Sequence, residues 1–276
     1  MPSIQVDRWP PSIVSTSLMK LVVPDSSVPA IDDLGMVEHE RSAALRGMRR
    51  FSISTPAGIA LRVYLLAFDI ETFSFEAFAA SGIACPPSVA RSVSKRQAEF
   101  YFGRLAARQA LEALGARVLD VGIGTSRQPL WPVGVIGSIS HTRTDAAAVA
   151  LRLGECSGVG IDLEPIAGPD ACAALSATVV DKDELIYLEA LADAWPISTL
   201  LTTVFSAKES LFKAAFGVVG RYFDFSAARV CLVDPEQGII RLRLTETLCD
   251  AFVREQICEI GFCFIKQDVV LTHFAW

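Results

Sequence analysis

Apolar residues in the first half of the chain follow two different spacings. Residues 61–69 (LRVYLLAFD) form an apolar run of the kind that makes a buried strand. Over residues 89–114 the apolar positions recur at helical spacing, and Gly115 follows them as a glycine often follows a helix. This part of the chain is therefore predicted to form a strand and then a long helix.

The rest of the chain repeats this mixture with shorter segments. Pro196 separates two helical patterns, and Gly154 marks a turn between two apolar runs. The pattern predicts strands at 136–141, 146–153 and 158–164, helices at 181–191 and 200–216, and a final series of strands within 228–274. Each half thus offers strands and one long helix, which predicts an α+β fold of two similar α/β subdomains. We place them at residues 1–155 and 156–276.

Residues 1–50 do not follow either spacing. Short apolar pieces alternate with stretches rich in proline and serine, and the segment ends in the basic sequence RGMRR at 46–50. We expect an irregular N-terminal arm that ends in a basic turn, and the sequence indicates no function for it.

Composition favours a folded globular protein. Of the 276 residues, 51% are hydrophobic and 20% are charged, which does not fit the disordered or fibrous classes. No uncharged stretch approaches the roughly 20 residues of a membrane span, and no basic segment precedes an apolar core near the N-terminus. The seven cysteines are odd in number and lack a C-x-x-C pair, so neither a disulfide framework nor a zinc site is indicated. We expect a cytoplasmic monomer.

Charge is distributed unevenly along the chain. The net charge of −6 argues against a nucleic-acid-binding protein, which usually carries a basic surface. Residues 91–117, however, hold six basic side chains against two acidic ones. We expect the helix at 89–114 to present this basic patch to a small anionic ligand.

Two acidic residues lie close together at 160–164 (GIDLE). Asp162 and Glu164 are two positions apart in a predicted strand, so both side chains point to the same face. Neighbouring carboxylates repel each other unless a cation or a shared proton compensates, and Mg²⁺ prefers such oxygen ligands. Taken alone, the pair is also compatible with a solvated strand face.

A second group of charged residues lies in the predicted helix at 205–213 (FSAKESLFK). Glu209 and Lys213 are four positions apart and share a helix face, as many surface pairs do. Lys208 and the apolar neighbours indicate that part of this face is buried, where charges need partners.

A third group is the sequence GSISH at 137–141. It carries His141, one of three histidines in the chain, together with Ser138 and Ser140. These side chains can donate hydrogen bonds to a phosphate. A single histidine after a strand is also compatible with a structural role.

Together the three groups resemble a known family. Their order, S-x-S-H, then G-(I/V)-D-x-E, then K-E-x-x-x-K, is similar to that of the 4′-phosphopantetheinyl transferases of the surfactin and enterobactin synthase type. Residues 95–104 (KRQAEFYFGR) and 131–141 (WPVGVIGSISH) resemble the enterobactin branch and its pseudomonad relatives. The resemblance covers about residues 91–225 and implies two α/β subdomains related by a pseudo-two-fold axis. It also implies the transfer of 4′-phosphopantetheine from coenzyme A to a carrier protein.

The resemblance implies a metal site and a phosphate site. Asp162, Glu164 and Glu209 would bind Mg²⁺, or Mn²⁺ as a substitute, on the coenzyme A pyrophosphate. Lys213 would contact the same phosphates. The 3′-phosphate would be bound by a set of four side chains, namely His141, Ser140, Arg91 and Arg96.

Two further roles follow from the same resemblance. The segment Arg127, Gln128 and Pro129 matches the loop that contacts adenine, although it differs from the frequent G-K-P. The general base for the carrier serine would be Glu184, with Glu209 or a metal-bound water as alternatives. A base must come within hydrogen-bonding distance of the serine proton, which the sequence cannot show.

The expected partner is an acidic acyl, peptidyl or aryl carrier protein that docks transiently. It would belong to siderophore, nonribosomal peptide, polyketide or fatty-acid synthesis. Aromatic residues at 205 and 221–225 are expected in the core, with a carrier-docking surface as the alternative. Two other functions stay open: a Mg²⁺-dependent hydrolase of nucleotide pyrophosphates, and a noncatalytic subunit that binds coenzyme A.

Overall fold

The computed structural model describes residues 32–33 and 43–276, and most of the predicted N-terminal arm lies outside these ranges. Where the arm is described, the predicted basic turn at 46–50 is wrong, because these residues belong to strand β2 (Leu45–Ser54). Met48 and Phe51 of β2 are buried, and the strand pairs with β3 (Ala60–Phe68) along its whole length. Burial of these apolar side chains and pairing of the backbone outweigh the turn-like composition.

The first half of the chain builds an antiparallel sheet, and its predicted strands are confirmed. The strand order is β1-β2-β3-β7-β6. The remaining strands are β1 (Asp32–Asp33), β6 (Val135–His141) and β7 (Asp145–Arg152). A separate hairpin pairs β4 (Gly122–Ile123) with β5 (Pro129–Leu130).

The long helix predicted at 89–114 is divided into two. Helix α2 (Pro87–Ala90) ends at Arg91, and α3 (Ser94–Ala113) begins after a short break. The Ser92 hydroxyl donates to the Val89 carbonyl, and the Gln97 amide donates to the carbonyls of Ala90 and Ser92. Such side-chain bonds satisfy backbone groups that a continuous helix would otherwise use. At the other end, Gly115 adopts φ +67°, as the predicted helix end requires.

The second half builds another antiparallel sheet in the order β8-β12-β11-β10-β9. Its strands are β8 (Val159–Pro165), β9 (Ala228–Asp234), β10 (Ile239–Leu244), β11 (Ile257–Lys266) and β12 (Val269–Ala275). Helices α5 (Lys182–Ala190) and α6 (Ile197–Val219) agree with the prediction, and Pro196 is the N-cap of α6. Helix α4 (Pro169–Thr178) was not predicted.

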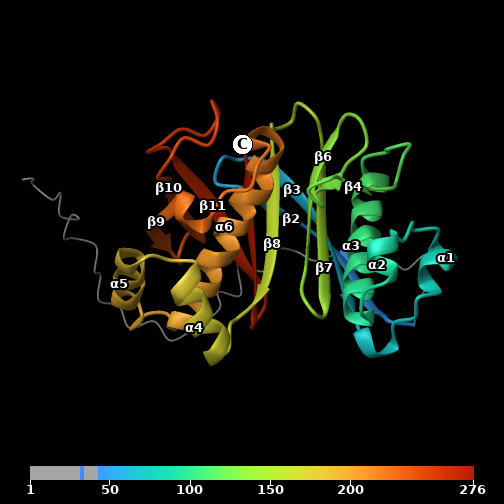
Figure 1. The fold of residues 1–276 in the computed structure, drawn as a ribbon, viewed down its shortest axis with the longest axis horizontal. Helices are drawn as coiled ribbons and strands as arrows, with labels where there is room; N and C mark the ends of the chain where they lie inside the picture. The colour runs from blue at the N-terminus through green and yellow to red at the C-terminus, as the bar shows by residue number, and fades with distance from the viewer. Residues whose placement is uncertain (1–31, 34–42) are drawn as a thin grey trace, which may run out of the picture.

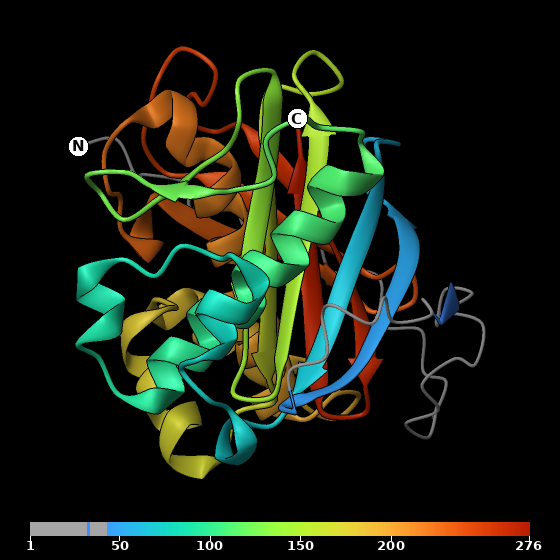
Figure 2. The same cartoon turned by 90° about the vertical axis from the view of Figure 1, so that its right-hand side faces the viewer.

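The two sheets lie between two long helices (Figure 1). Helix α3 covers the outer face of the first sheet and crosses its strands diagonally (Figure 2), whereas α6 covers the outer face of the second. Between the sheets, Val63 and Val149 of the first and Ile161 and Leu271 of the second share one core. The predicted α+β class is confirmed, with an order of layers of helix, sheet, sheet and helix.

Smaller elements complete the described chain. These are helix α1 (Ala77–Ser81) and the short 3₁₀ helices η2 (Ile70–Thr72) and η3 (Phe225–Ala227). Among the described residues, no helix is long and apolar enough to cross a membrane. The division at 155/156 and the pseudo-two-fold axis stay predictions, although the change of sheet occurs between β7 and β8.

Candidate active site

Helix α6 lies directly on strand β8, and Gly160 makes this close approach possible. A Cβ atom at Gly160 would lie 2.0 Å from the Ser210 carbonyl oxygen and 2.8 Å from the Ala214 nitrogen. Both atoms belong to the backbone of α6 and cannot rotate away. The glycine of the G-I-D-x-E sequence therefore brings Glu209 and Lys213 of the helix over Asp162 of the strand.

Asp162 is the centre of this crossing and is only 3% exposed. Its Oδ1 accepts hydrogen bonds from Lys213 Nζ at 2.6 Å and from Ser140 Oγ at 2.9 Å. Its Oδ2 is buried and has no hydrogen-bond partner among the described residues. A buried carboxylate oxygen without a partner is costly, which points to a cationic ligand at this position.

The negative charges of Glu164 and Glu209, beside Asp162, are also not fully balanced by positive charge. Burial, with the charge of Asp162 in addition, raises the pKa of Glu164 to about 8, and Lys213 only partly opposes the shift. Burial likewise raises the pKa of Glu209, again with Asp162 adding and Lys213 opposing. The charge of Asp162 acts on both glutamates, and the assignment of the three carboxylates to one metal site stays a prediction.

The three carboxylates have the chemistry of ligands for a hard divalent cation, but they are not arranged around a common point. Across 32–33 and 43–276, no three or more His, Cys, Asp or Glu side chains already converge as metal ligands. Lys213 instead provides the positive charge at Asp162. The oxygen donors of Asp162, Glu164 and Glu209 are nevertheless of the type that Mg²⁺ binds.

Two serine hydroxyls join the sheets where β6 lies beside β8. The backbone N–H of Ile161 donates to Ser138 Oγ at 3.0 Å, and that of Leu163 donates to Ser140 Oγ at 3.1 Å. Ser138 and Ser140 are two positions apart, so both point toward β8. Ser140 is buried, and its hydroxyl is used inside this joint. Its assignment to the 3′-phosphate stays a prediction.

His141 lies at the end of β6 next to the basic helix α3. Its Nε2 is 3.1 Å from Arg96 Nη1, and its Nδ1 is 3.9 Å from Glu99 Oε2. Burial, reinforced by the charges of Arg96 and Lys213, lowers the pKa of His141 to about 4. The imidazole is therefore neutral at neutral pH, and Nε2 accepts a hydrogen bond from Arg96. Arg96 supplies the positive charge at this end of β6, which favours an anionic ligand.

The other residues predicted to bind phosphate and adenine lie on α2 and on the β4–β5 hairpin. Arg91 is the exposed C-cap of α2 rather than part of the long helix. Arg127 is exposed at φ +64° in the turn between β4 and β5, Pro129 belongs to β5, and the Gln128 Oε1 accepts from the backbone of the same turn. Their roles toward a nucleotide stay predictions.

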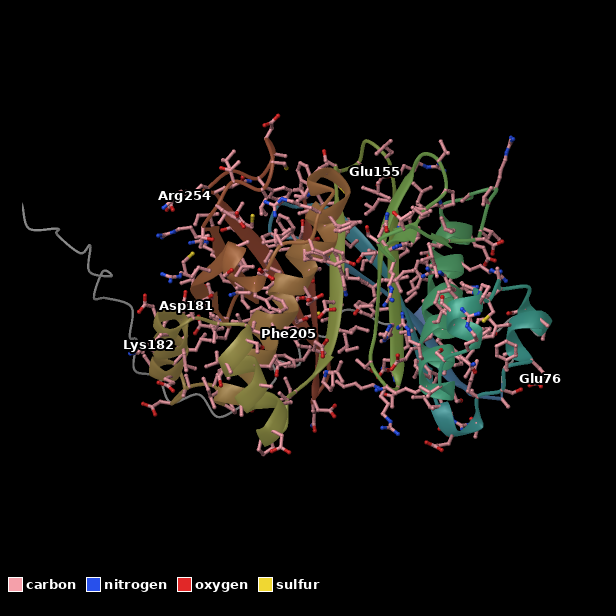
Figure 3. The ribbon with its side chains drawn as sticks, in the orientation of Figure 1. Glu76, Glu155, Asp181, Lys182, Phe205 and Arg254 are labelled. Carbon is pink, nitrogen blue, oxygen red and sulfur yellow. The ribbon has the colours of Figure 1, made fainter. Side chains whose placement is uncertain are left out.

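Glu184, the predicted general base, is part of the core. It is 3% exposed, and its Oε2 accepts the Asp181 N–H at 2.8 Å in a capping box of α5. Its Oε1 accepts the Val230 N–H at 2.6 Å and forms an ion pair with buried Lys208 at 2.9 Å. Helix α6 separates α5 from β8, and Asp181, at the start of α5, lies well to the left of β8 (Figure 3). Both carboxylate oxygens of Glu184 are thus engaged in the core, and its role as a base stays a prediction.

Sequence reasoning missed several residues that position the site. Gly160 was read only as part of a motif, although a glycine in a strand often marks a close backbone approach. Ser138 was read as a phosphate donor, whereas its spacing from Ser140 equally predicts one shared strand face. Tyr222 is exposed and not in the core as expected for the aromatic residues at 221–225, and the sequence has no signal for its hydrogen bond to the turn at 124–128.

Comparison with known proteins agrees with the geometry. A family model described as "4'-phosphopantetheinyl transferase N-terminal domain" matches residues 86–151. A second, described as "4'-phosphopantetheinyl transferase superfamily", matches residues 158–271. The two together account for nearly two thirds of the chain.

Relatives with curated names are similar over part of their length. Enterobactin synthase component D of Salmonella typhi is 44% identical over 120 residues, which are 44% of this chain and 48% of that protein. The 4′-phosphopantetheinyl transferase Svp of Streptomyces mobaraensis is 36% identical over 157 residues, 56% of this chain and 62% of that protein. The corresponding enzyme Npt of Nocardia iowensis is 32% identical over 142 residues, 51% and 62% respectively. The matched region spans about half of the first of these relatives and less than two thirds of the other two. From its two family matches and the motifs they contain, the chain belongs to the 4′-phosphopantetheinyl transferase superfamily.

Proposed function

We propose that this protein transfers the 4′-phosphopantetheine group of coenzyme A to a serine of an apo carrier protein. The serine oxygen attacks the phosphorus that bears pantetheine, a new P–O bond forms, and the bond to the leaving 3′,5′-ADP breaks. The serine proton passes to a base. The observation that carries this proposal is the crossing of α6 over β8, which gathers Asp162, Glu164, Glu209 and Lys213 beside His141.

The metal is Mg²⁺, for which Mn²⁺ can substitute, and the residues that would hold it are Asp162, Glu164 and Glu209. The unpartnered Oδ2 of Asp162 and the raised pKa of Glu164 support this assignment. When bound, such an ion neutralises charge on the pyrophosphate and on the leaving group.

The protein's own cations position the phosphates. Lys213 Nζ, 26% exposed at its side chain, can exchange its contact with Asp162 for one with a phosphate oxygen. Arg96 and His141 form the neighbouring set of donors for the 3′-phosphate. Phosphoryl transfer depends on positioning and charge neutralisation more than on covalent help, which matches this arrangement.

Of the carboxylates considered as a base, Glu209 is the one we retain. It lies on α6 at the acidic cluster, and burial raises the pKa of its carboxyl above the ordinary value. Glu184 is not proposed, because both of its oxygens are engaged in the core.

We propose an acidic carrier protein as the transient partner, with the transferase acting as a monomer. Relatives named as components of enterobactin synthase favour a carrier of siderophore synthesis. A carrier of another pathway with a similar acidic surface around its serine would dock in the same way.

Mass spectrometry of the carrier tests the proposal. The protein is incubated with coenzyme A, Mg²⁺ and apo carriers of the siderophore, polyketide and fatty-acid types. We expect the mass of phosphopantetheine to be added to at least one carrier, with release of 3′,5′-ADP. Release of that nucleotide without a carrier would indicate a hydrolase. No mass addition to any carrier, with coenzyme A still bound, would indicate a noncatalytic subunit.

A further inference from the structure

We propose that Tyr222 is a positioning residue that fixes the β4–β5 hairpin against the second half of the molecule for coenzyme A binding. The proposal rests on the proposed function, because it takes the turn at 124–128 as part of the nucleotide site. The juxtaposition that carries it is a hydrogen bond of 2.8 Å from the Tyr222 hydroxyl to the Ser126 carbonyl, across 96 residues of sequence.

The hairpin turn is organised by its own side chains. The Gly124 N–H donates to the Gln128 carbonyl at 2.8 Å, and the Ser126 N–H donates to Gln128 Oε1 at 3.0 Å. A Cβ atom at Gly124 would lie 2.3 Å from the Gln128 side chain, so this side chain is packed on the turn. The Gln128 side chain therefore bonds within the turn, and the Ser126 carbonyl accepts the hydrogen bond from Tyr222.

Tyr222 connects this turn to the acidic cluster through α6. Its ring stacks on Phe212 with centroids 5.6 Å apart and planes at 23°, and it meets Phe216 edge-on. Phe212 precedes Lys213 in α6 and lies three positions after Glu209. In Figure 2 the hairpin extends from the half that holds α3 toward the orange segment of α6. The position of the turn is thereby tied to the helix that carries the proposed catalytic groups.

Burial does not explain this tyrosine. Its side chain is 64% exposed, whereas the core of the second half is formed by other residues. The ring of Tyr222 packs on Phe212 of α6, and its hydroxyl donates to the Ser126 carbonyl of the hairpin turn. Tyr222 therefore acts as a strut, by which we mean a side chain that holds the hairpin turn at a fixed position relative to α6. A strut of this kind preorganises a loop, and preorganisation lowers the entropic cost of binding a ligand.

The consequence is specific to one substrate. If the hairpin contacts the nucleotide of coenzyme A, loss of the strut weakens coenzyme A binding but leaves the reacting groups at Asp162 in place. The KM for coenzyme A should therefore rise, while kcat and the KM for the carrier stay unchanged. A general loss of fold would instead lower kcat and the Tm together.

Tyr222→Phe is the informative variant, because it removes the hydroxyl and keeps the ring on Phe212. Tyr64→Phe is the matched control: Tyr64 is 3% exposed, and its hydroxyl has no hydrogen-bond partner among the described residues. The measurements are hydrogen exchange of the Gly124 and Arg127 amides in the free protein, coenzyme A affinity by calorimetry, and steady-state kinetics.

For Tyr222→Phe we expect faster exchange at both amides and a rise of about three- to tenfold in the dissociation constant and KM for coenzyme A, the range that one such hydrogen bond supplies. Tyr64→Phe should match the wild type. Unchanged exchange and unchanged KM in Tyr222→Phe would overturn the strut, as would a fall in kcat at constant KM. Failure of the wild type to bind coenzyme A would refute the proposed function instead, and the exchange rates in the free protein would still decide whether Tyr222 holds the turn.

Discussion

At the scale of single residues, Asp162 shows how one carboxylate organises the site. One oxygen accepts from Ser140 and Lys213, and so fixes the orientation of the group. The other oxygen is buried without a partner among the described residues. The fixed oxygen holds the side chain in position, and the open oxygen is the one available to a cation.

Asp162→Asn should abolish transfer and preserve the fold. The amide keeps the size of the side chain but removes the charge that a metal and Lys213 require. We expect kcat to fall by at least about 100-fold, as is common when charge stabilisation is removed from an active site, with a Tm close to that of the wild type. Carrier mass spectrometry and circular dichroism measure the two effects. The exposed Asp193→Asn provides the control, and normal turnover of Asp162→Asn would remove this residue from the site.

Glu184 gives the opposite prediction, because its role is in the core. Glu184→Ala would leave Lys208 buried without its partner, at a cost of about 3–5 kcal/mol in the free energy of unfolding. Glu184→Gln keeps the shape and should cost less. We expect Glu184→Gln to retain kcat within about twofold per folded molecule, whereas loss of a general base lowers rates by roughly 10²–10⁴-fold. Denaturant titration and active-site-normalised kinetics separate these outcomes, and a rate loss of that size would restore Glu184 as the base.

At the scale of elements, the contact between β8 and α6 decides where the acids and Lys213 lie. A helix and a strand can approach so closely only if no side chain stands between their backbones. Gly158 and Gly160 both face α6, and a Cβ at Gly158 would lie 2.3 Å from the Ala214 carbonyl oxygen. The two glycines, two positions apart on one strand face, form the surface on which the helix lies.

Gly160→Ala should displace α6 and reduce both stability and activity. The added methyl group would meet helix backbone, so we expect a loss of at least about 1–3 kcal/mol, the usual cost of overpacking. Gly217→Ala is the matched control, since Gly217 lies exposed within α6 and no atom lies within 4 Å of its Cβ position. That change should be neutral or stabilise by up to about 1 kcal/mol. Chemical denaturation measures both variants, and equal stabilities would contradict the close contact.

Several elements followed directly from the sequence, and the exceptions have physical causes. The strand over 61–69 and the helix over 200–216 could be predicted because the spacing of apolar residues within each segment is sufficient to indicate its secondary structure. The break at 91–93 was not predicted, since it depends on side chains of Ser92 and Gln97 that reach particular carbonyls. The capping box at 181–184 was not recognised, although D-x-x-E is a signal that the sequence contained, and the role of Glu184 as a base stays a prediction.

At the scale of the whole molecule, the halves are joined by both apolar and polar contacts. The core between the sheets is apolar, and the Ser138 and Ser140 hydroxyls bridge the neighbouring edges. In addition, Lys266 Nζ lies 2.7 and 2.6 Å from the two oxygens of fully buried Asp145. The active site, which draws residues from both halves, depends on these joints.

The contribution of His273 to the free energy of unfolding should be lost as the pH is lowered from about 6.5 to about 4. Burial lowers the pKa of His273 to about 4 in the folded protein, against 6.5 for an ordinary histidine. Between these values the unfolded chain binds a proton that the native state does not, so acid favours unfolding. The effect is on the order of 3 kcal/mol for a shift of this size.

Comparison with His273→Gln isolates this contribution. Glu164, whose folded pKa is raised to about 8, contributes the opposite slope between about 4.5 and 8, but it does so in both proteins. The difference in unfolding free energy between wild type and variant should therefore change as the pH falls from 6.5 to 4 and stay constant above it. Denaturant unfolding at several pH values measures the difference, and parallel curves would contradict the assignment to His273.

The sequence by itself predicted the α+β class, strands β3, β6, β7 and β8, and helices α5 and α6, and it offered the acidic and basic side chains considered for the site. These properties depend on local spacing and on the chemistry of each side chain, which the chain order records. Tertiary structure alone decided which groups are available. It placed α6 on Gly160, used the Ser140 hydroxyl in the joint to β8, buried Glu184 with Lys208 and brought Tyr222 to Ser126. Such contacts join residues distant in sequence, and local spacing carries no information about their geometry.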